Sequence, residues 1–272
     1  MENKTNKFYE KWVRSRRNIR EYDINKAFKN IPEKYFSNAL EIGSGDGFQS
    51  GLLIKYCKSL VCTEINEERF DKSLLKQENG LRFMAADAEN LPFPDNSFDL
   101  IFSSNMLEHV KDKKKSLSEM KRVLKNDGIM VHIIPNRLMK LFNFIFYYPF
   151  AIRIILNKEA RKIAFAKIKD DSKRCNIKSK DVSVFRKMLP PIHGEDKNHF
   201  SEYINFGKNC WEKLFKENGV VVIKVLKMSL SSSYRFGLDN ARRILQNMGL
   251  CTSFAYITVK ESHKSEAEIY FV

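Results

Sequence analysis

A short acidic and glycine-rich segment is the part of this sequence best suited to hold a small ligand. It reads EIGSGDG over residues 41–47 and follows an apolar run. Glycines at 43, 45 and 47 allow a positive φ and remove side chains where a ligand must touch the backbone. A helix starting after the segment would add free N–H groups at its N-terminus. An ordinary tight turn between a strand and a helix has the same pattern, so the segment needs support from elsewhere in the chain.

Two carboxylates downstream provide that support. Glu64 closes a second apolar run, about twenty residues after the glycine segment, where an acidic side chain can accept hydrogen bonds from both hydroxyls of a ribose. Asp87 follows a third apolar run and can accept a hydrogen bond from an adenine amino group. The three features together predict a cleft that binds a nucleoside.

From residue 38 onward, apolar runs alternate with helical stretches. This alternation implies βαβ units and a parallel sheet. The pattern predicts helices at 49–58, 67–79, 115–124, 210–218 and 238–248, and strands at 39–42, 60–63, 81–85, 98–103, 128–134, 220–228 and 253–260. We divide the chain into a helical lead-in (1–37), a ligand-binding core (38–136), a basic cap insertion (137–205) and the remainder of the core sheet (206–272).

Four ordered motifs carry a resemblance to a known family. They are EIGSGDG, the strand-end Glu64, AADAENLPFPDNSFDLIFSSNMLEHV and MKRVLKNDGIMVHIIPN. Together they resemble the class I S-adenosylmethionine-dependent methyltransferases, in particular the ubiquinone/menaquinone-type subgroup. The resemblance covers roughly residues 38–136 and continues more loosely over 211–228. NAD-binding Rossmann enzymes match less well because they lack the LPFPDNSFD-type segment.

The resemblance implies an α/β fold and a cofactor. The fold would be a Rossmann-like seven-stranded, mostly parallel sheet with an antiparallel last strand at 253–260, helices on both faces and a helical cap. The cofactor would be S-adenosylmethionine, which supplies the reactivity while the protein supplies alignment. The implied contacts are Glu41, Gly43, Ser44 and Gly45 at its methionine end, Glu64 and Ile65 at the ribose, Asp87 and Ala88 at the adenine, and Ser104 and Asn105 beneath the methyl donor.

Three histidines are candidates for a catalytic base, which helps if the methyl acceptor is a hydroxyl group. His109 follows the strand at 98–103, whereas His193 and His199 lie in a polar run of the insertion. Each also has a purely structural interpretation, as a residue packing a helix start or as part of an ordinary polar loop. His132 falls inside a strand and is expected in the core. His199 and Glu202 are too few to form a metal site, so we expect no metal.

Most of the positive charge lies in the insertion. Residues 137–187 contain fourteen Lys and Arg against four Asp and Glu, which leaves +10 of the total +15. Segment 138–156 is rich in Phe, Ile and Leu, but Lys140, Asn143 and Arg153 interrupt it and Pro149 divides it, which disfavours a membrane span. We expect an amphipathic element on an anionic membrane surface, with Lys and Arg towards the headgroups. Packing on the sheet or in a homodimer is the alternative. Nucleic acid fits poorly, because the aromatic residues are mixed with Ile and Leu.

The sequence therefore predicts a methyltransferase that acts on a lipid-linked or membrane-proximal small molecule, or on a surface-glycan sugar, by O-methylation. The alternatives are an RNA or protein methyltransferase on the same fold, and a non-catalytic, membrane-associated cofactor-binding protein. The five cysteines form no CxxC pair and the N-terminus has no apolar signal segment. We expect a cytoplasmic location, peripheral at the inner face of the membrane.

Overall fold

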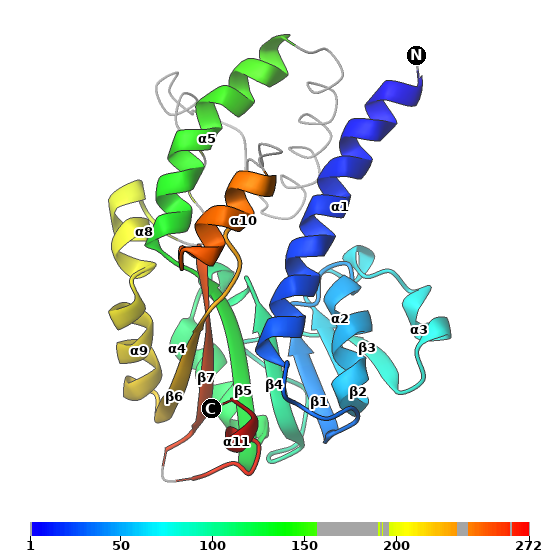
Figure 1. Cartoon of the computed structure of the whole chain (residues 1–272). Coiled ribbons are helices and arrows are strands. Elements are labelled where there is room, and N and C mark those ends of the chain that lie inside the picture. The colour runs from blue at the N-terminus through cyan, green and yellow to red at the C-terminus, as the bar shows by residue number, and fades with distance from the viewer. Residues whose placement is uncertain are drawn as a thin grey trace.

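A computed structural model describes residues 2–156, 190, 192, 196–232, 239–261 and 263–271. Its centre is a seven-stranded sheet in the order β3-β2-β1-β4-β5-β7-β6 (Figure 1). β7 is antiparallel to both of its neighbours, and the other four neighbouring pairs are parallel. The predicted Rossmann-like sheet is thus confirmed. The strands are β1 Phe36–Ile42, β2 Cys57–Glu64, β3 Leu81–Ala85, β4 Phe98–Ser104, β5 Leu124–Pro135, β6 Val220–Lys227 and β7 Ser253–Lys260.

Helices cover both faces of this sheet (Figure 1). The longer ones are α1 Glu2–Ala27, α4 Lys113–Val123, α5 Arg137–Leu156, α9 Lys208–Glu217 and α10 Asp239–Asn247. The shorter ones are α2 Phe48–Leu53, α3 Leu74–Gln77, α8 His199–Asn205 and α11 Glu268–Phe271, with single 3₁₀ turns η1 Ile54–Tyr56, η2 Glu67–Arg69 and η3 Leu107–His109. Most of the basic segment 137–187, together with His193, lies outside the described residues.

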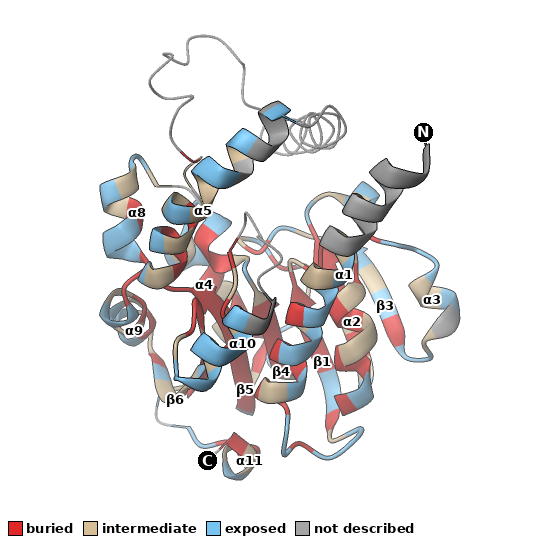
Figure 2. Ribbon diagram, turned by 45° about the horizontal axis from the view of Figure 1, so that its top comes forward, coloured by how far each residue is buried: buried red, intermediate tan, exposed pale blue. Residues whose placement is uncertain are grey.

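The two faces of the sheet have separate apolar cores, because side chains alternate along a strand. Phe28 just after α1, Leu53 of α2 and Phe271 of α11 pack on one face. Leu117 of α4 and Phe215 of α9 pack on the other. Figure 2 shows the strands as the buried layer between them. A sheet covered on both sides explains why the strands read as nearly continuous apolar runs.

One predicted helix is wrong. Residues 67–79 form only the turn η2 and the single helical turn α3, with extended backbone at Phe70 between them. Phe70 leaves the helical path to stack on Phe83, with ring centroids 4.4 Å apart, and it is buried there. Asp71 then accepts a hydrogen bond from the Ser73 N–H at 3.0 Å. Burial of this aromatic ring therefore prevails over helical periodicity.

A buried acid connects α1 to the segment after β6. Asp23 accepts hydrogen bonds from the backbone N–H and the hydroxyl of Ser229, both at 2.9 Å. Burial raises the pKa of Asp23 to about 6, although the two bonds from Ser229 oppose the rise. The contact holds α1 against the sheet at a point 206 residues away in sequence.

This raised pKa makes stability depend on pH. Between the ordinary value of 3.8 and about 6, the unfolded chain releases the Asp23 proton while the folded chain keeps it. The free energy of unfolding therefore falls as pH rises through this window, by up to about 3 kcal/mol. The Asp23→Asn variant lacks this contribution, which urea unfolding of both proteins at pH 4 and pH 7 will measure. An equal pH dependence in the variant would contradict the assignment.

Candidate functional site

The glycine segment forms a compact turn at the end of β1. Gly43, Gly45 and Gly47 all have positive φ, between 60° and 76°. A Cβ on Gly43 would lie 2.4 Å from Met106 Cγ, so no larger residue fits there. The N–H groups of Gly43 and Ser44 donate to the Thr63 carbonyl at 2.8 and 2.9 Å. These bonds hold the turn against the end of β2.

Glu64, the last residue of β2, lies directly at this turn. Its side chain is 4% exposed. One carboxylate oxygen accepts from the Gly45 N–H at 3.0 Å, and the other is 2.9 Å from the Arg69 guanidinium. The structure therefore brings together the glycine turn and the predicted ribose-binding acid. It also shows that Arg69 occupies one of the two oxygens that a ribose would use.

The ends of β3 and β4 border the same edge. The Ala86 N–H donates to the Glu64 carbonyl at 3.3 Å, which brings the exposed Asp87 and the buried Ala88 next to β2. The Asp87 carboxylate accepts from the Glu89 N–H at 2.9 Å. Ile65 follows Glu64 and is largely exposed.

On the other side of β1, Ser104 closes β4 and Asn105 adopts a positive φ of 50°. The Asn105 N–H donates to the Ile133 carbonyl at 2.8 Å, and its amide donates to the Ser104 hydroxyl at 3.2 Å. Met106 next to them is the residue that contacts Gly43. The carboxyl ends of β3, β2, β1 and β4 thus collect the predicted cofactor residues along one edge of the sheet.

Two polar groups below the turn fit a bound polar ligand. Glu41 is buried and accepts a short hydrogen bond from the Ser50 hydroxyl. Burial raises the pKa of Glu41 to about 7, while hydrogen bonds from Ser50 and Cys62 oppose the rise. The Ser44 hydroxyl is also buried and has no hydrogen-bond partner in the described part of the chain. A turn closed to side chains, a neighbouring acid and an unsatisfied hydroxyl suit a nucleoside with a charged amino-acid tail.

Helix α1 adds contacts that the sequence analysis missed. Asp46 of the glycine turn pairs with Arg16 at 2.8 Å and with Arg20 at 3.4 Å. These arginines lie 30 and 26 residues before their partner, and Arg69 lies five residues after Glu64. No motif indicates such pairs, because they depend on how the chain folds back on itself.

The predicted catalytic histidines do not meet in one place. His109 is exposed at the end of η3, and its Nε2 is 3.9 Å from the buried Glu108 carboxylate. His199 begins α8, and its Nδ1 is 2.7 Å from Lys140 Nζ. Because an ammonium group only donates, His199 Nδ1 accepts and its proton is on Nε2. His109 lies at the edge that carries the cofactor residues, whereas the ring of His199 on α8 packs against α5. Their catalytic roles stay predictions, and His193 lies outside the described residues.

His132 packs in the core, as expected for a histidine inside a strand. Its Nδ1 is 2.8 Å from the Ser103 hydroxyl, and its ring stacks on Phe215 with centroids 5.5 Å apart. Burial lowers the pKa of His132 to about 3, so the ring is neutral at physiological pH. It belongs to the framework that supports the ends of β4 and β5.

Helix α5 is oriented differently from the sequence-based expectation. Lys140 was expected to face lipid headgroups, but both Lys140 and the nearby Asn143 are buried. Lys140 forms a short ion pair with the buried Glu202, and Asn143 accepts from the Ser232 hydroxyl at 2.9 Å. The polar side of the helix thus faces inward and not outward as predicted, because the partners of these residues come from distant segments. The helix also continues through Pro149.

The outer side of α5 is apolar. Its exposed large residues are Leu141, Ile145, Tyr148, Ile152 and Leu156. Their spacing of three or four residues places them along one side of a helix. Figure 2 shows the corresponding exposed stretches. No helix in the described ranges combines the length and the apolar character needed to cross a bilayer.

Comparisons with known proteins concern the part of the chain that contains these residues. A family model described as a methyltransferase domain matches residues 40–132. The uncharacterized methyltransferase YcgJ of Bacillus subtilis is 37% identical over 93 residues, which are 33% of this chain and 37% of that protein. A ubiquinone/menaquinone biosynthesis C-methyltransferase, UbiE of Rickettsia bellii, is 39% identical over 103 residues, or 34% of this chain and 42% of that one. The chain thus spans less than half the length of these two relatives.

Solved structures support the fold. A SAM-dependent methyltransferase from Thermotoga maritima superposes with a TM-score of 0.53 at 19% identity, covering 94% of this chain and 96% of that one. The YcgJ structure gives 0.50 at 16% identity, covering 88% and 98%. At such identities the likeness concerns the fold alone. With the ordered motifs and the family match over residues 40–132, it leads to one conclusion: this part of the chain is a methyltransferase domain of the type that uses S-adenosylmethionine.

Proposed function

We propose that this protein transfers a methyl group to a lipid-linked or membrane-proximal small molecule. The cofactor, when bound, supplies an electrophilic methyl group on its sulfonium, and a nucleophile of the acceptor displaces the sulfur. The chain has to align the two reactants and keep water away. We assign the methionine end of the cofactor to the glycine turn and Glu41, its ribose to Glu64, its adenine to Asp87 and Ala88, and the methyl group to the side of Ser104 and Asn105.

The observation that carries the acceptor proposal is the apolar stripe on α5. Leu141 and Ile145 are each 51% exposed, and Ile152 is 57% exposed. The helix starts one residue after β5 and rises from the sheet edge that holds the cofactor residues (Figure 1). Apolar side chains of this size favour contact with lipid, worth about 25 cal/mol per Å² removed from water. An acceptor carried by a membrane would meet the methyl donor at this edge.

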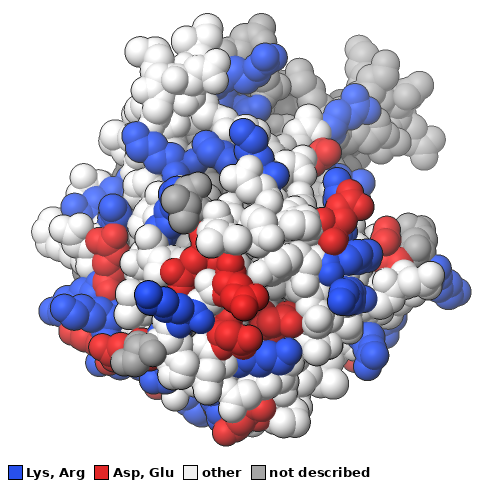
Figure 3. Space-filling view, turned by 60° about the horizontal axis from the view of Figure 1, so that its bottom comes forward, with Lys and Arg blue, Asp and Glu red and all other residues white. Residues whose placement is uncertain are grey.

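The charge distribution also supports contact with a membrane. Segment 137–187, which begins with α5, carries a net charge of +10. In contrast, the end of the molecule near α11 shows Asp and Glu gathered among Lys and Arg (Figure 3). An apolar stripe within a stretch of sequence that is strongly basic fits an anionic membrane surface better than it fits a second copy of an equally basic chain.

We propose O-methylation, for which the exposed His109 at the cofactor edge is the candidate base. A specific observation favours a second chemistry, because the UbiE relatives are named as C-methyltransferases of ubiquinone/menaquinone biosynthesis. C-methylation of a ring carbon in a quinone precursor is therefore the alternative. The ¹³C chemical shift of the transferred methyl group distinguishes oxygen from carbon attachment.

The first test concerns the ribose-binding acid. Glu64→Gln should weaken binding of S-adenosylmethionine at least tenfold, because a charged acceptor of two hydrogen bonds is lost. Arg69→Met should instead tighten binding a few-fold, because the competing guanidinium is removed while the Gly45 N–H still holds the other carboxylate oxygen. Isothermal titration calorimetry measures both. Weaker binding by Arg69→Met would contradict the competition and make Arg69 a cofactor contact.

The second test uses the pKa of Glu41. At pH 6 this carboxyl is mostly protonated, since its pKa is about 7. A cationic cofactor end nearby favours the ionised form. Affinity should therefore rise between pH 6 and pH 8, and binding near neutral pH should release protons, seen as heats that vary with the ionisation enthalpy of the buffer. Glu41→Gln should remove both effects, and an unchanged pH profile in that variant would refute the role.

The third test concerns the membrane. In the triple variant Leu141→Ser/Ile145→Ser/Ile152→Ser, the affinity for anionic phospholipid vesicles measured by flotation should fall at least tenfold. The rate of radiolabelled methyl transfer into a membrane lipid extract should fall by a similar factor. The matched control is Ile269→Ser, which removes a residue 70% exposed on α11 at the opposite end of the sheet. If the wild type stays unbound, or if the triple variant instead dissociates a dimer, the membrane proposal fails.

A further inference from the structure

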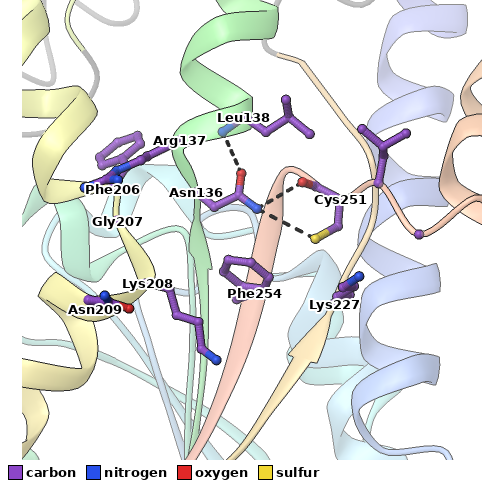
Figure 4. Close-up of a pocket in the computed structure, with 12 residues that line it drawn as sticks. Asn136, Arg137, Leu138, Phe206, Gly207, Lys208, Asn209, Lys227, Cys251 and Phe254 are labelled. Atoms are coloured by element: carbon purple, nitrogen blue, oxygen red, sulfur yellow. Dashed lines mark hydrogen bonds between the residues drawn. The ribbon is translucent and has the colours of Figure 1, made fainter.

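A pocket separate from the predicted cofactor residues opens further along the same sheet edge (Figure 4). Its volume is about 460 Å³. Its walls come from the start of α5, the junction of α8 and α9, the end of β6, and the segment that enters β7. The polar residues that line it are Asn136, Arg137, Lys208, Asn209, Lys227 and Cys251.

The lining of this pocket is positively charged. Arg137, Lys208 and Lys227 belong to it, and it contains no Asp or Glu among the described residues. Figure 4 shows Lys208 and Lys227 on opposite sides of Phe254, with Arg137 above them. Several cations around one concave surface repel one another and attract an anion with several acceptor oxygens.

One of these cations is fixed by its surroundings. The Arg137 guanidinium donates to the carbonyls of Tyr203 and Ile204 at 3.0 and 3.2 Å, and it lies over the Tyr203 ring. A Cβ on Gly207 would be only 2.6 Å from Arg137 Nη2, so this position leaves room for the guanidinium only as glycine. Gly207 is also the N-cap of the ten-residue α9 and provides no side-chain cap, which leaves N–H groups at that end of the pocket.

The two lysines are available to a ligand. Lys208 pairs only with Glu212 on its own helix, at 3.4 Å, among the interactions of the described residues. Lys227 forms no ion pair with any residue that the structure describes. Gly249, which also lines the pocket near this ammonium group, has a positive φ of 89° that favours glycine. The segment that contains Gly249 is also held by Asn136, whose amide donates to the Cys251 carbonyl at 2.9 Å.

We propose that this pocket binds a phosphate group of the methyl acceptor. The inference rests on the proposed function and specifies its substrate class as a phosphorylated compound. β5 lies beside β4, and the pocket extends from β5 across β7 to β6. With strands about 4.8 Å apart, it lies on the order of 5–15 Å from the tip of β4, where the methyl donor is assigned. An acceptor anchored here by its phosphate would extend its reacting group towards the donor.

The test uses inorganic pyrophosphate as the probe. The double variant Lys208→Gln/Lys227→Gln should bind pyrophosphate at least tenfold more weakly than the wild type in calorimetry at low salt. The matched control is Lys213→Gln/Lys216→Gln, which makes the same change of net charge on α9 outside the pocket. Thermal unfolding checks that both variants are folded. No binding by the wild type, or equal weakening in the control, would overturn the proposal.

A second arm identifies the source of the phosphate. The same variants are floated with anionic phospholipid vesicles. Weaker pyrophosphate binding with unchanged flotation assigns the pocket to a phosphorylated acceptor, whereas a loss in both assays assigns it to a lipid headgroup phosphate. Pyrophosphate binding does not involve the apolar stripe on α5. If the flotation test of that stripe fails, the pyrophosphate experiment therefore still tests the pocket.

Discussion

The hydrogen bond from the Gly45 N–H to the Glu64 carboxylate is the interaction on which the site depends. It joins the ends of two neighbouring parallel strands, and both are also tied through the Thr63 carbonyl. The carboxylate is buried, and both of its oxygens have partners, one in the Gly45 N–H and the other in the Arg69 guanidinium. Because all the parallel strands end at the same edge, fixing β1 against β2 also fixes the loops that leave β3 and β4. The cofactor residues, which are far apart in sequence, are thereby collected at one edge.

Much of this arrangement could be predicted from the sequence, because the strands of a parallel sheet are covered on both faces and read as apolar runs. The glycine turn, Glu64 and Asp87 follow directly from those runs. Local patterns failed where a distant partner decides the outcome. Phe70 leaves a helical pattern to stack on Phe83, and the arginines of α1 reach Asp46 from another part of the chain. The prediction that Lys140 of α5 faces outward was wrong because its partner, Glu202, is 62 residues away in sequence.

The stripe on α5 and the basic pocket belong to one proposed path for the acceptor. Both begin where β5 ends, since Arg137 is at once the first residue of α5 and part of the pocket lining. The stripe would take an apolar portion of the acceptor, the pocket its phosphate, and the tip of β4 its reacting atom. A molecule with these three portions in that order is an amphiphile with a phosphorylated head. The cofactor, in contrast, is assigned entirely to the other half of the edge, from β4 to β3.

The buried ion pair of Lys140 and Glu202 has a consequence for how the α5 surface is used. The helix cannot roll its apolar side inward, because that movement would separate two buried charges, at a cost of several kcal/mol. The stripe therefore faces away from the sheet whenever this ion pair is intact. In the proposed function, recruitment through the stripe would follow mass action, set by the abundance of enzyme and of binding surface in the cell.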